Sequence, residues 1–241
     1  MKISVIIPAF NEERLLGETL RQVKTAMEAF ARCGWNSELI VCDNNSTDRT
    51  TEIAREAGVI VVFEAVNQIA RARNRGASIA TGDWLVFVDA DSHPSVELFT
   101  DVAEQIKSSH CLAGGVTVQL DEKHFVAGLV TRLWNCASRI FKLPAGSFIF
   151  CEAAAYRKIG GFNNELFAAE ELELSKRLWQ LARHTNKKVV ILHRHPLITS
   201  ARKMRLYSSW EHLRLLARVI FSRGRILRNR EAAHLWYDGR R

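Results

Sequence analysis

Two carboxylates that stand one residue apart, Asp89 and Asp91, follow directly after the apolar run Trp84–Val88. A run of five apolar residues closed by acids predicts a buried parallel strand whose carboxyl end opens into a crevice. Ligands of open α/β sheets bind at such strand ends, and two carboxylates there suit a divalent cation that also holds phosphates. The alternative is that Asp91 or Ser92 caps a helix after Pro94, which leaves Asp89 unexplained.

Strands and helices alternate on both sides of this pair. The first half of the chain predicts strands over 3–8, 38–42, 59–63 and 84–88, with helices over 16–30, 53–57 and 69–80. Asn11 is a candidate cap for the first of these helices, and Gly34 is its expected end. Such alternation indicates right-handed βαβ units and a mostly parallel sheet with helices on both faces.

The second half is less regular. It predicts strands over 112–120, 146–151, 188–192 and 196–199, with helices over 125–141 and 170–182. No internal repeat or low-complexity linker divides the chain. We therefore expect an α/β fold in one compact unit, extended at its C-terminus by a basic helical arm.

The charge of the chain is concentrated in that arm. Residues 201–241 contain eleven Lys and Arg and three acids, so they carry the whole net charge of +8, and residues 1–200 are neutral. No apolar stretch reaches the roughly 20 residues that span a bilayer, and the N-terminus lacks a secretory signal. The five cysteines are odd in number and lack metal-site spacing, so we expect buried, reduced thiols in a cytoplasmic protein.

Four polar motifs stand in order along the chain. They are Ile7-Pro8-Ala9-Phe10-Asn11-Glu12, Asp43-Asn44-Asn45-Ser46-Thr47-Asp48, Arg73-Asn74-Arg75-Gly76-Ala77 before Asp89-Ala90-Asp91, and Gly160-Gly161-Phe162-Asn163 before Glu170-Glu171. Together they closely resemble the family 2 glycosyltransferases, which have the Rossmann-like GT-A fold. The resemblance covers roughly residues 1–200. It implies transfer of a sugar from a nucleotide-sugar donor to an acceptor hydroxyl or phosphate, with inversion.

The resemblance makes Asp89-Ala90-Asp91 the donor and metal motif. It implies that Asp91, followed by Asp89, binds Mg²⁺ or Mn²⁺, which acts as a Lewis acid on the leaving diphosphate. Some relatives add a late histidine, and His193 or His195 could fill that place. Spacing puts both on one face of a strand and does not separate them. The alternative is a basic strand end at the surface.

The ends of the first two strands match the place where the family holds the nucleoside. The residues implied are Pro8, Phe10, Glu12, Asp43 and Asn44, for a UDP- or GDP-sugar. Asn44 stands where an acid is frequent, so the preference for one base stays open, since an amide both donates and accepts. The alternative for residues 43–48, above all for Ser46 and Asp48, is turn formation and helix capping.

Two arginines are candidates for the diphosphate. Arg73 has the guanidinium geometry that suits phosphate, although a solvated helix charge is an equal reading. Arg202 follows the last predicted strand in a turn that resembles one in bacterial members of the family, and it could close over the donor.

The resemblance assigns the general base to the Glu170-Glu171 pair. It places the base that deprotonates the acceptor hydroxyl at Glu171, where the family commonly has Asp, with Glu170 as the second candidate. The alternative is two acids in the first turn of a helix, where the helix dipole favours them.

The acceptor side combines apolar and basic residues. The predicted helix 125–141 and a second stripe over 206–220 are basic and contain tryptophan, which is typical of membrane-surface elements and of a lipid-linked acceptor. Packing of both stripes on the core or on a second subunit is the alternative. We expect a nucleotide-sugar half over 1–120, an acceptor half over 121–200 and the arm over 201–241. No nucleic-acid recognition module surrounds the arm.

Two other functions fit parts of this pattern. A sugar-nucleotidyltransferase would need a glycine-rich loop after the first strand, and residues 8–14 contain no glycine. A non-catalytic nucleotide-sugar sensor or membrane scaffold would not need Asp89, Asp91 and Glu171 together. The glutamate at 171 is the one feature that favours it.

Overall fold

A computed structural model describes residues 1–121, 125–144 and 146–200, without the side chains of 125–127. The predicted arm 201–241, including Arg202, lies outside the described residues. No helix within the described part is long and apolar enough to cross a membrane.

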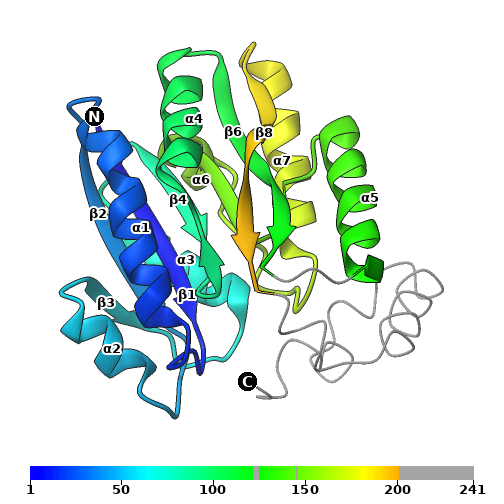
Figure 1. The fold of residues 1–241 in the computed structure, drawn as a ribbon. Coiled ribbons are helices and arrows are strands. Elements are labelled where there is room, and N and C mark those ends of the chain that lie inside the picture. The colour runs from blue at the N-terminus through cyan, green and yellow to red at the C-terminus, as the bar shows by residue number, and fades with distance from the viewer. Residues whose placement is uncertain (122–124, 145, 201–241) are drawn as a thin grey trace.

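The sheet has eight strands in the order β3-β2-β1-β4-β7-β6-β8-β5 (Figure 1). The pairs β1–β2, β2–β3, β1–β4 and β6–β8 are parallel, whereas β7 runs antiparallel between β4 and β6, and the short β5 is antiparallel to β8. The mostly parallel sheet is therefore as predicted. The strands are β1 (Lys2–Ala9), β2 (Asn36–Asp43), β3 (Ile60–Phe63), β4 (Trp84–Val88), β5 (Ser92–His93), β6 (Cys111–Leu120), β7 (Phe148–Glu152) and β8 (Lys188–Thr199).

Helices cover both faces of the sheet, as expected. One apolar layer joins the sheet to α1, α2 and α4, and the other joins it to α3, α6 and α7, while α5 packs beside β6. The helices are α1 (Leu16–Ala31), α2 (Thr50–Glu56), α3 (Ile69–Ile79), α4 (Val96–Lys107), α5 (Phe125–Phe141), α6 (Ala153–Lys158) and α7 (Glu170–His184).

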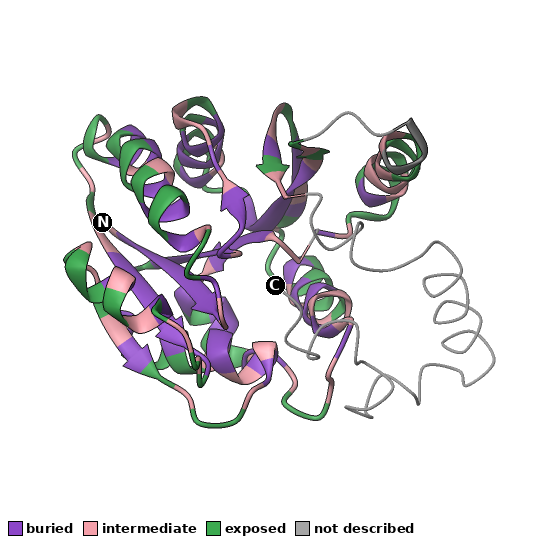
Figure 2. Cartoon of the chain, turned by 60° about the horizontal axis from the view of Figure 1, so that its bottom comes forward, coloured by how far each residue is buried: buried purple, intermediate pink, exposed green. Residues whose placement is uncertain are grey.

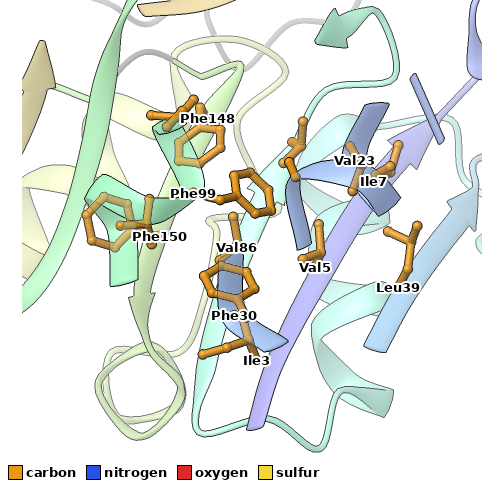
Figure 3. Close-up of a cluster of buried hydrophobic side chains, with 14 of the residues drawn as sticks. Ile3, Val5, Ile7, Val23, Phe30, Leu39, Val86, Phe99, Phe148 and Phe150 are labelled. Carbon is orange, nitrogen blue, oxygen red and sulfur yellow. The ribbon is translucent and has the colours of Figure 1, made fainter. Parts of the chain in front are cut away.

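The central strands are buried on both faces, as the purple sheet in Figure 2 shows. Ile3, Val5 and Ile7 of β1 point into the layer of α1 and α4, which Figure 3 shows, and Ile6 points into the opposite layer. Within the first layer the rings of Phe30 and Phe99 lie 5.1 Å apart. Burial on both faces explains why β1 and β4 are nearly continuous apolar runs.

The predicted cap at Asn11 is wrong, and the alternative cap at Asp91 or Ser92 does not form either. Asn11 does not cap α1, because its backbone is left-handed (φ 51°) and its side-chain oxygen accepts the N–H of Thr47 at 2.8 Å. Ser95 caps α4 through the N–H of Leu98, at 3.1 Å. Asp91 and Ser92 are thus not the cap of that helix, and the capping alternative for the acidic pair falls.

The last strand also differs from its prediction. The two short strands expected over 188–192 and 196–199 form one strand, β8, which runs beside β6 with a break in register. Val116 pairs with Leu192 and Val118 pairs with Leu197, so residues 193–196 stand opposite Thr117 alone.

The cysteines are free, as predicted. Cys42, Cys111 and Cys151 are buried, Cys33 is half-buried, and Cys136 on α5 is exposed, against the expectation that all are buried.

Candidate active site

The segment Asp89–Asp91 lies where β4 ends, held between two other strands. The N–H of Asp89 donates to the carbonyl of Ser147 just before β7, at 3.1 Å. The carbonyl of Asp91 accepts the N–H of Ser200 just after β8, also at 3.1 Å. Asp91 is buried, whereas the Asp89 side chain is 19% exposed. The two carboxylates therefore stand on a rigid turn with one of them open to a ligand.

Arg73 connects this turn to the start of α7. Its Nη1 donates to Oε1 of Glu170 at 2.7 Å, and its Nη2 donates to Oδ1 of Asp89 at 2.9 Å and to the carbonyl of Gly146 at 2.8 Å. The guanidinium also lies over the ring of Phe162, 5.1 Å from its centre. Arg73 is only 1% exposed, so the reading of a solvated helix charge is wrong.

The charge of Arg73 is held in place by its acids. Burial disfavours the charged guanidinium, but the carboxylates of Asp89 and Glu170 more than offset this and raise the pKa of Arg73 above its ordinary value. The two terminal nitrogens, Nη1 and Nη2, are engaged by protein acceptors, whereas the buried Nε has no hydrogen-bond partner among the described residues. These contacts make Arg73 a clamp on two carboxylates and give no support to its predicted direct contact with the diphosphate.

The adjacent acids at the start of α7 have different surroundings. Glu170 is buried and paired with Arg73. Burial and the charge of Glu170 raise the pKa of Glu171, Arg73 opposes them, and the net pKa is about 8. A Cβ built at Gly146 would lie 3.3 Å from the Glu171 carboxyl carbon, so the loop backbone lies directly against this side chain. A carboxyl whose pKa is raised by burial and by a neighbouring charge is characteristic of acid–base sites.

The ends of β1 and β2 form the next part of the edge. Asp43 is buried, and its carboxylate accepts the N–H of Ser46 at 3.1 Å, which shapes the turn after β2. Asn44 donates to the carbonyl of Val66 at 2.6 Å and accepts the N–H of Gln68 at 2.8 Å. Its amide thus holds the segment after β3, which competes with the predicted contact to a base.

The first-strand residues of the predicted nucleoside site share this edge. Pro8 lies in β1 and pairs with Cys42 of β2. Phe10 is half-buried just after β1, and Glu12 is buried with its N–H donating to Oγ1 of Thr50 at 2.7 Å. This bond joins the end of the first strand to the start of α2.

Asp48 has the structural role that was the alternative for this turn. Burial would raise its pKa, but bonds from the hydroxyl and N–H of Thr50 lower it overall. Its carboxylate lies 3.0 Å from that N–H, at the first residue of α2. The Asp48 carboxylate also accepts the N–H of Glu13 at 3.1 Å, so it links the start of α2 to the segment after β1.

The family model for glycosyl transferase family 2 matches residues 4–158. The chain belongs to the family 2 glycosyltransferases. The match begins in β1 and ends in α6, so it includes Asp43, Arg73 and the Asp89–Asp91 turn.

Curated proteins are similar to parts of this family 2 glycosyltransferase. A dolichol-phosphate mannosyltransferase of Pyrococcus furiosus is 33% identical over 120 residues, which cover 48% of this chain and 33% of that one. The matched segments cover about a third of the first curated relatives' lengths.

Two solved structures of lower identity share the GT-A architecture with this chain. The structure of a mannosyltransferase from Pyrobaculum calidifontis with GDP-mannose and Mn²⁺ has a TM-score of 0.70 at 17% identity, covering 95% of this chain and 63% of that one. The structure of Mycobacterium tuberculosis glucosyl-3-phosphoglycerate synthase with Mn²⁺, UDP-glucose and phosphoglyceric acid has a TM-score of 0.63 at 18% identity. That match covers 92% of this chain and 78% of that one.

The two candidate histidines of this family 2 glycosyltransferase diverge, so the prediction that they share a strand face is wrong. Nδ1 of His195 lies 3.0 Å from Oδ2 of Asp101 on α4, whereas His193 lines a cavity beside α5. The register break explains this, because an irregular strand segment re-aims its side chains. No group of three metal-ligating side chains forms among the residues that the structure describes.

Asp89 and Asp91 nonetheless suit a hard cation. Mg²⁺ and Mn²⁺ sites of enzymes that handle phosphates use one or two carboxylates, with water and phosphate oxygens as the remaining ligands. Two carboxylates at one strand end, one of them 19% exposed, fit that donor set.

The structure gives a place in the site to Gly146, which the sequence did not single out, and to Phe162 and Asn74, which stood in the motifs without an assigned role. Gly146 contributes only a backbone carbonyl, which no side-chain pattern reveals. Phe162 covers Arg73, and its backbone is fixed by Asn74, whose side chain accepts the N–H of Phe162 at 2.9 Å. The motifs around 73–74 and 160–163 are therefore two halves of one contact between α3 and the loop before α7.

Proposed function

We propose that this family 2 glycosyltransferase moves a sugar from a UDP- or GDP-sugar to an acceptor hydroxyl or phosphate, with inversion at the anomeric carbon. One observation carries the proposal: buried Arg73 joins Asp89, beside Asp91, to Glu170, beside Glu171. Two carboxylates suited to a metal and a carboxyl of raised pKa are thereby collected at one edge of the sheet.

Asp91 and Asp89 are the residues that would hold Mg²⁺ or Mn²⁺. When bound, such an ion supplies Lewis-acid stabilisation of the leaving diphosphate. The two solved structures that contain Mn²⁺ together with a nucleotide sugar support this assignment. His193 and His195 are left out of this assignment, since His195 pairs with Asp101 and His193 lines the cavity beside α5.

Glu171 is the proposed general base. It would take the proton of the acceptor hydroxyl while the new bond to the anomeric carbon forms and the bond to the diphosphate breaks. Glu170 is less suited, because its carboxylate is already bound by Arg73. We assign Glu170 the role of a positioning residue that keeps the start of α7 against the donor edge.

The nucleoside would lie on the ends of β1 and β2. Pro8, Phe10, Glu12 and Asp43 shape this wall, and Ala90 lies buried between the two acids. Asn44 contributes indirectly, through the segment 64–68 that it holds. The contact of Arg202 with the donor, the attachment of the arm to a membrane and a lipid-linked acceptor remain predictions.

The experiment is release of nucleoside diphosphate from UDP- and GDP-sugars in Mn²⁺, measured for the wild type and for Glu171→Gln. Loss of a general base lowers the rate by about a hundredfold or more, and the Mn²⁺-dependent binding of donor should persist. Glu56→Gln, an exposed acid at the end of α2, is the matched control and should behave as wild type. A Glu171→Gln variant of full activity would refute the assignment of the base.

A further inference from the structure

A cavity of about 630 Å³ lies between α5 and the strands β6 and β8. None of the residues assigned to the donor edge lines it. Its polar wall contains Arg132 and Arg139 of α5, Lys142 directly after α5, Thr117 of β6 and His193 of β8. Ile140, Ile191 and Pro196 supply apolar walls.

The register break in β8 produces this cavity. Residues 193–196 stand opposite Thr117 alone, so the two strands lack regular pairing there. Pro196 has no N–H to donate to a ladder, which favours the break at this position. His193 and Thr117, on the two sides of this break, both line the cavity.

Two local contacts fix the cationic wall. Asn135 accepts the N–H of Val118 at 3.0 Å and donates to its carbonyl at 2.8 Å, so α5 is anchored to β6. Arg132 and Arg139 stand three and four residues from this anchor and therefore project on the same helix face. Lys142 has a left-handed backbone (φ 56°), at the position after a helix that glycine commonly occupies.

The wall has unmatched positive charge. No acidic residue lines the cavity, and in the described part of the chain Arg132, Arg139 and Lys142 form no ion pair. The hydroxyl of Thr117 is buried and has no hydrogen-bond partner among the described residues. A buried hydroxyl without a partner is costly, so its presence in a cationic cavity points to a ligand that accepts a hydrogen bond from it.

We propose that this cavity binds the phosphate monoester group of the acceptor. Guanidinium groups match phosphate oxygens with paired N–H donors, the Thr117 hydroxyl adds one donor, and Ile140 and Ile191 contact the organic part of the ligand. The role of this ligand as acceptor rests on the proposed glycosyltransferase function, whereas binding of a phosphate group in the cavity does not.

The loop after α5 connects the cavity to the reaction site. Lys142 lines the cavity, and Gly146, four residues later, binds Arg73 and lies against Glu171. Four residues of extended chain span at most about 14 Å, so a small phosphorylated acceptor can reach from the cavity toward Glu171.

The test is calorimetric titration of the full chain with phenyl phosphate and with inorganic phosphate, without nucleotide or metal. We expect binding of phenyl phosphate that weakens about tenfold or more when Arg132→Gln and Arg139→Gln are combined, and severalfold in Thr117→Val. Arg55→Gln removes an exposed cation of α2 and should bind as the wild type does. Arg132 and Arg139 are exposed, so their replacement should leave the fold intact, and thermal melting verifies this for each variant.

Vesicles distinguish the sources of the phosphate. Binding to phosphatidic acid vesicles, but not to phosphatidylcholine or phosphatidylglycerol vesicles, with loss in the arginine variants, identifies a lipid phosphate. Binding of phenyl phosphate without vesicle binding identifies a soluble phosphorylated acceptor.

The cavity proposal is overturned if the wild type binds neither phenyl phosphate nor phosphatidic acid vesicles, or if the arginine variants bind them equally well. Donor binding is measured on the same samples with Mn²⁺. If donor binding is intact and phosphate binding is absent, the cavity proposal fails alone. The converse result removes the glycosyltransferase proposal and keeps the anion site.

Discussion

Replacement of Arg73 by methionine tests how the candidate site is held together. The change keeps an unbranched side chain in a place that is 1% exposed and removes the charge that Glu170 and Asp89 share. Glu170, whose side chain is 5% exposed, would then keep a buried carboxylate without its cation.

The expected loss of stability follows from that geometry. Breaking a buried ion pair by removal of one partner costs about 3–5 kcal/mol, because a buried charge is left uncompensated. In a chain of this size 1 kcal/mol lowers Tm by about 2–4 °C, so Arg73→Met should lower it by about 6–20 °C. The double variant Arg73→Met with Glu170→Gln should recover part of this loss, since a neutral amide needs no counter-ion.

The assay is denaturant unfolding of the two single variants, the double variant and a control from the same helix. Arg71 pairs with Glu64 at 3.2 Å, but its side chain is 38% exposed, so Arg71→Met should cost about 1 kcal/mol or less. The reasoning is refuted if Arg73→Met is no less stable than Arg71→Met, or if the double variant is no more stable than Arg73→Met.

Three further predictions concern the base, the loop beside it and the second half of the sheet. The kcat/KM should fall as the pH is lowered below about 8, because Glu171 must be ionised to take a proton; a flat profile down to pH 6 would exclude it. Gly146→Ala puts a Cβ 3.3 Å from the carboxyl carbon of Glu171 and should reduce transfer about tenfold without loss of Mn²⁺-dependent donor binding, both measured on one sample; equal losses would contradict this. Gly114→Ala puts a Cβ 2.7 Å from the carbonyl oxygen of Val190 and 2.5 Å from the Phe150 ring, so it should destabilise the fold by about 1–3 kcal/mol in denaturant unfolding, and a neutral effect would show that β6 can shift.

Strongly periodic segments could be predicted from the sequence. β4 has the bounds that its apolar run indicated, and α5 spans the predicted 125–141. A continuous apolar run or a long helical repeat of apolar residues favours one type of secondary structure. The parallel sheet followed from the alternation of strands and helices. The prediction that Asn11 caps a helix was wrong because an asparagine side chain can stabilise a turn as well as a helix start. Its partner Thr47 lies 36 residues away in the sequence.

The structure of the site depends on contacts that a linear pattern does not contain. An arginine-rich helix reads as solvated, yet Arg73 is buried against acids 16 and 97 residues away in the sequence. The proximity of His193 and His195 in sequence suggested one shared face, but the pairing of β8 with β6 set their directions. The candidate residues could therefore be named from the sequence, but which of them contact one another could not be predicted from it.

The central claim is tested most directly by a thermal-shift panel of UDP-, GDP-, CMP- and dTDP-sugars, each with and without Mn²⁺. A ligand at a hundred times its Kd stabilises the native state by about 2.7 kcal/mol, which corresponds to about 5–10 °C here. We expect a shift with a UDP- or GDP-sugar that requires Mn²⁺ and disappears in Asp91→Asn. No shift with any donor, or a shift that is the same without metal and in Asp91→Asn, would contradict it.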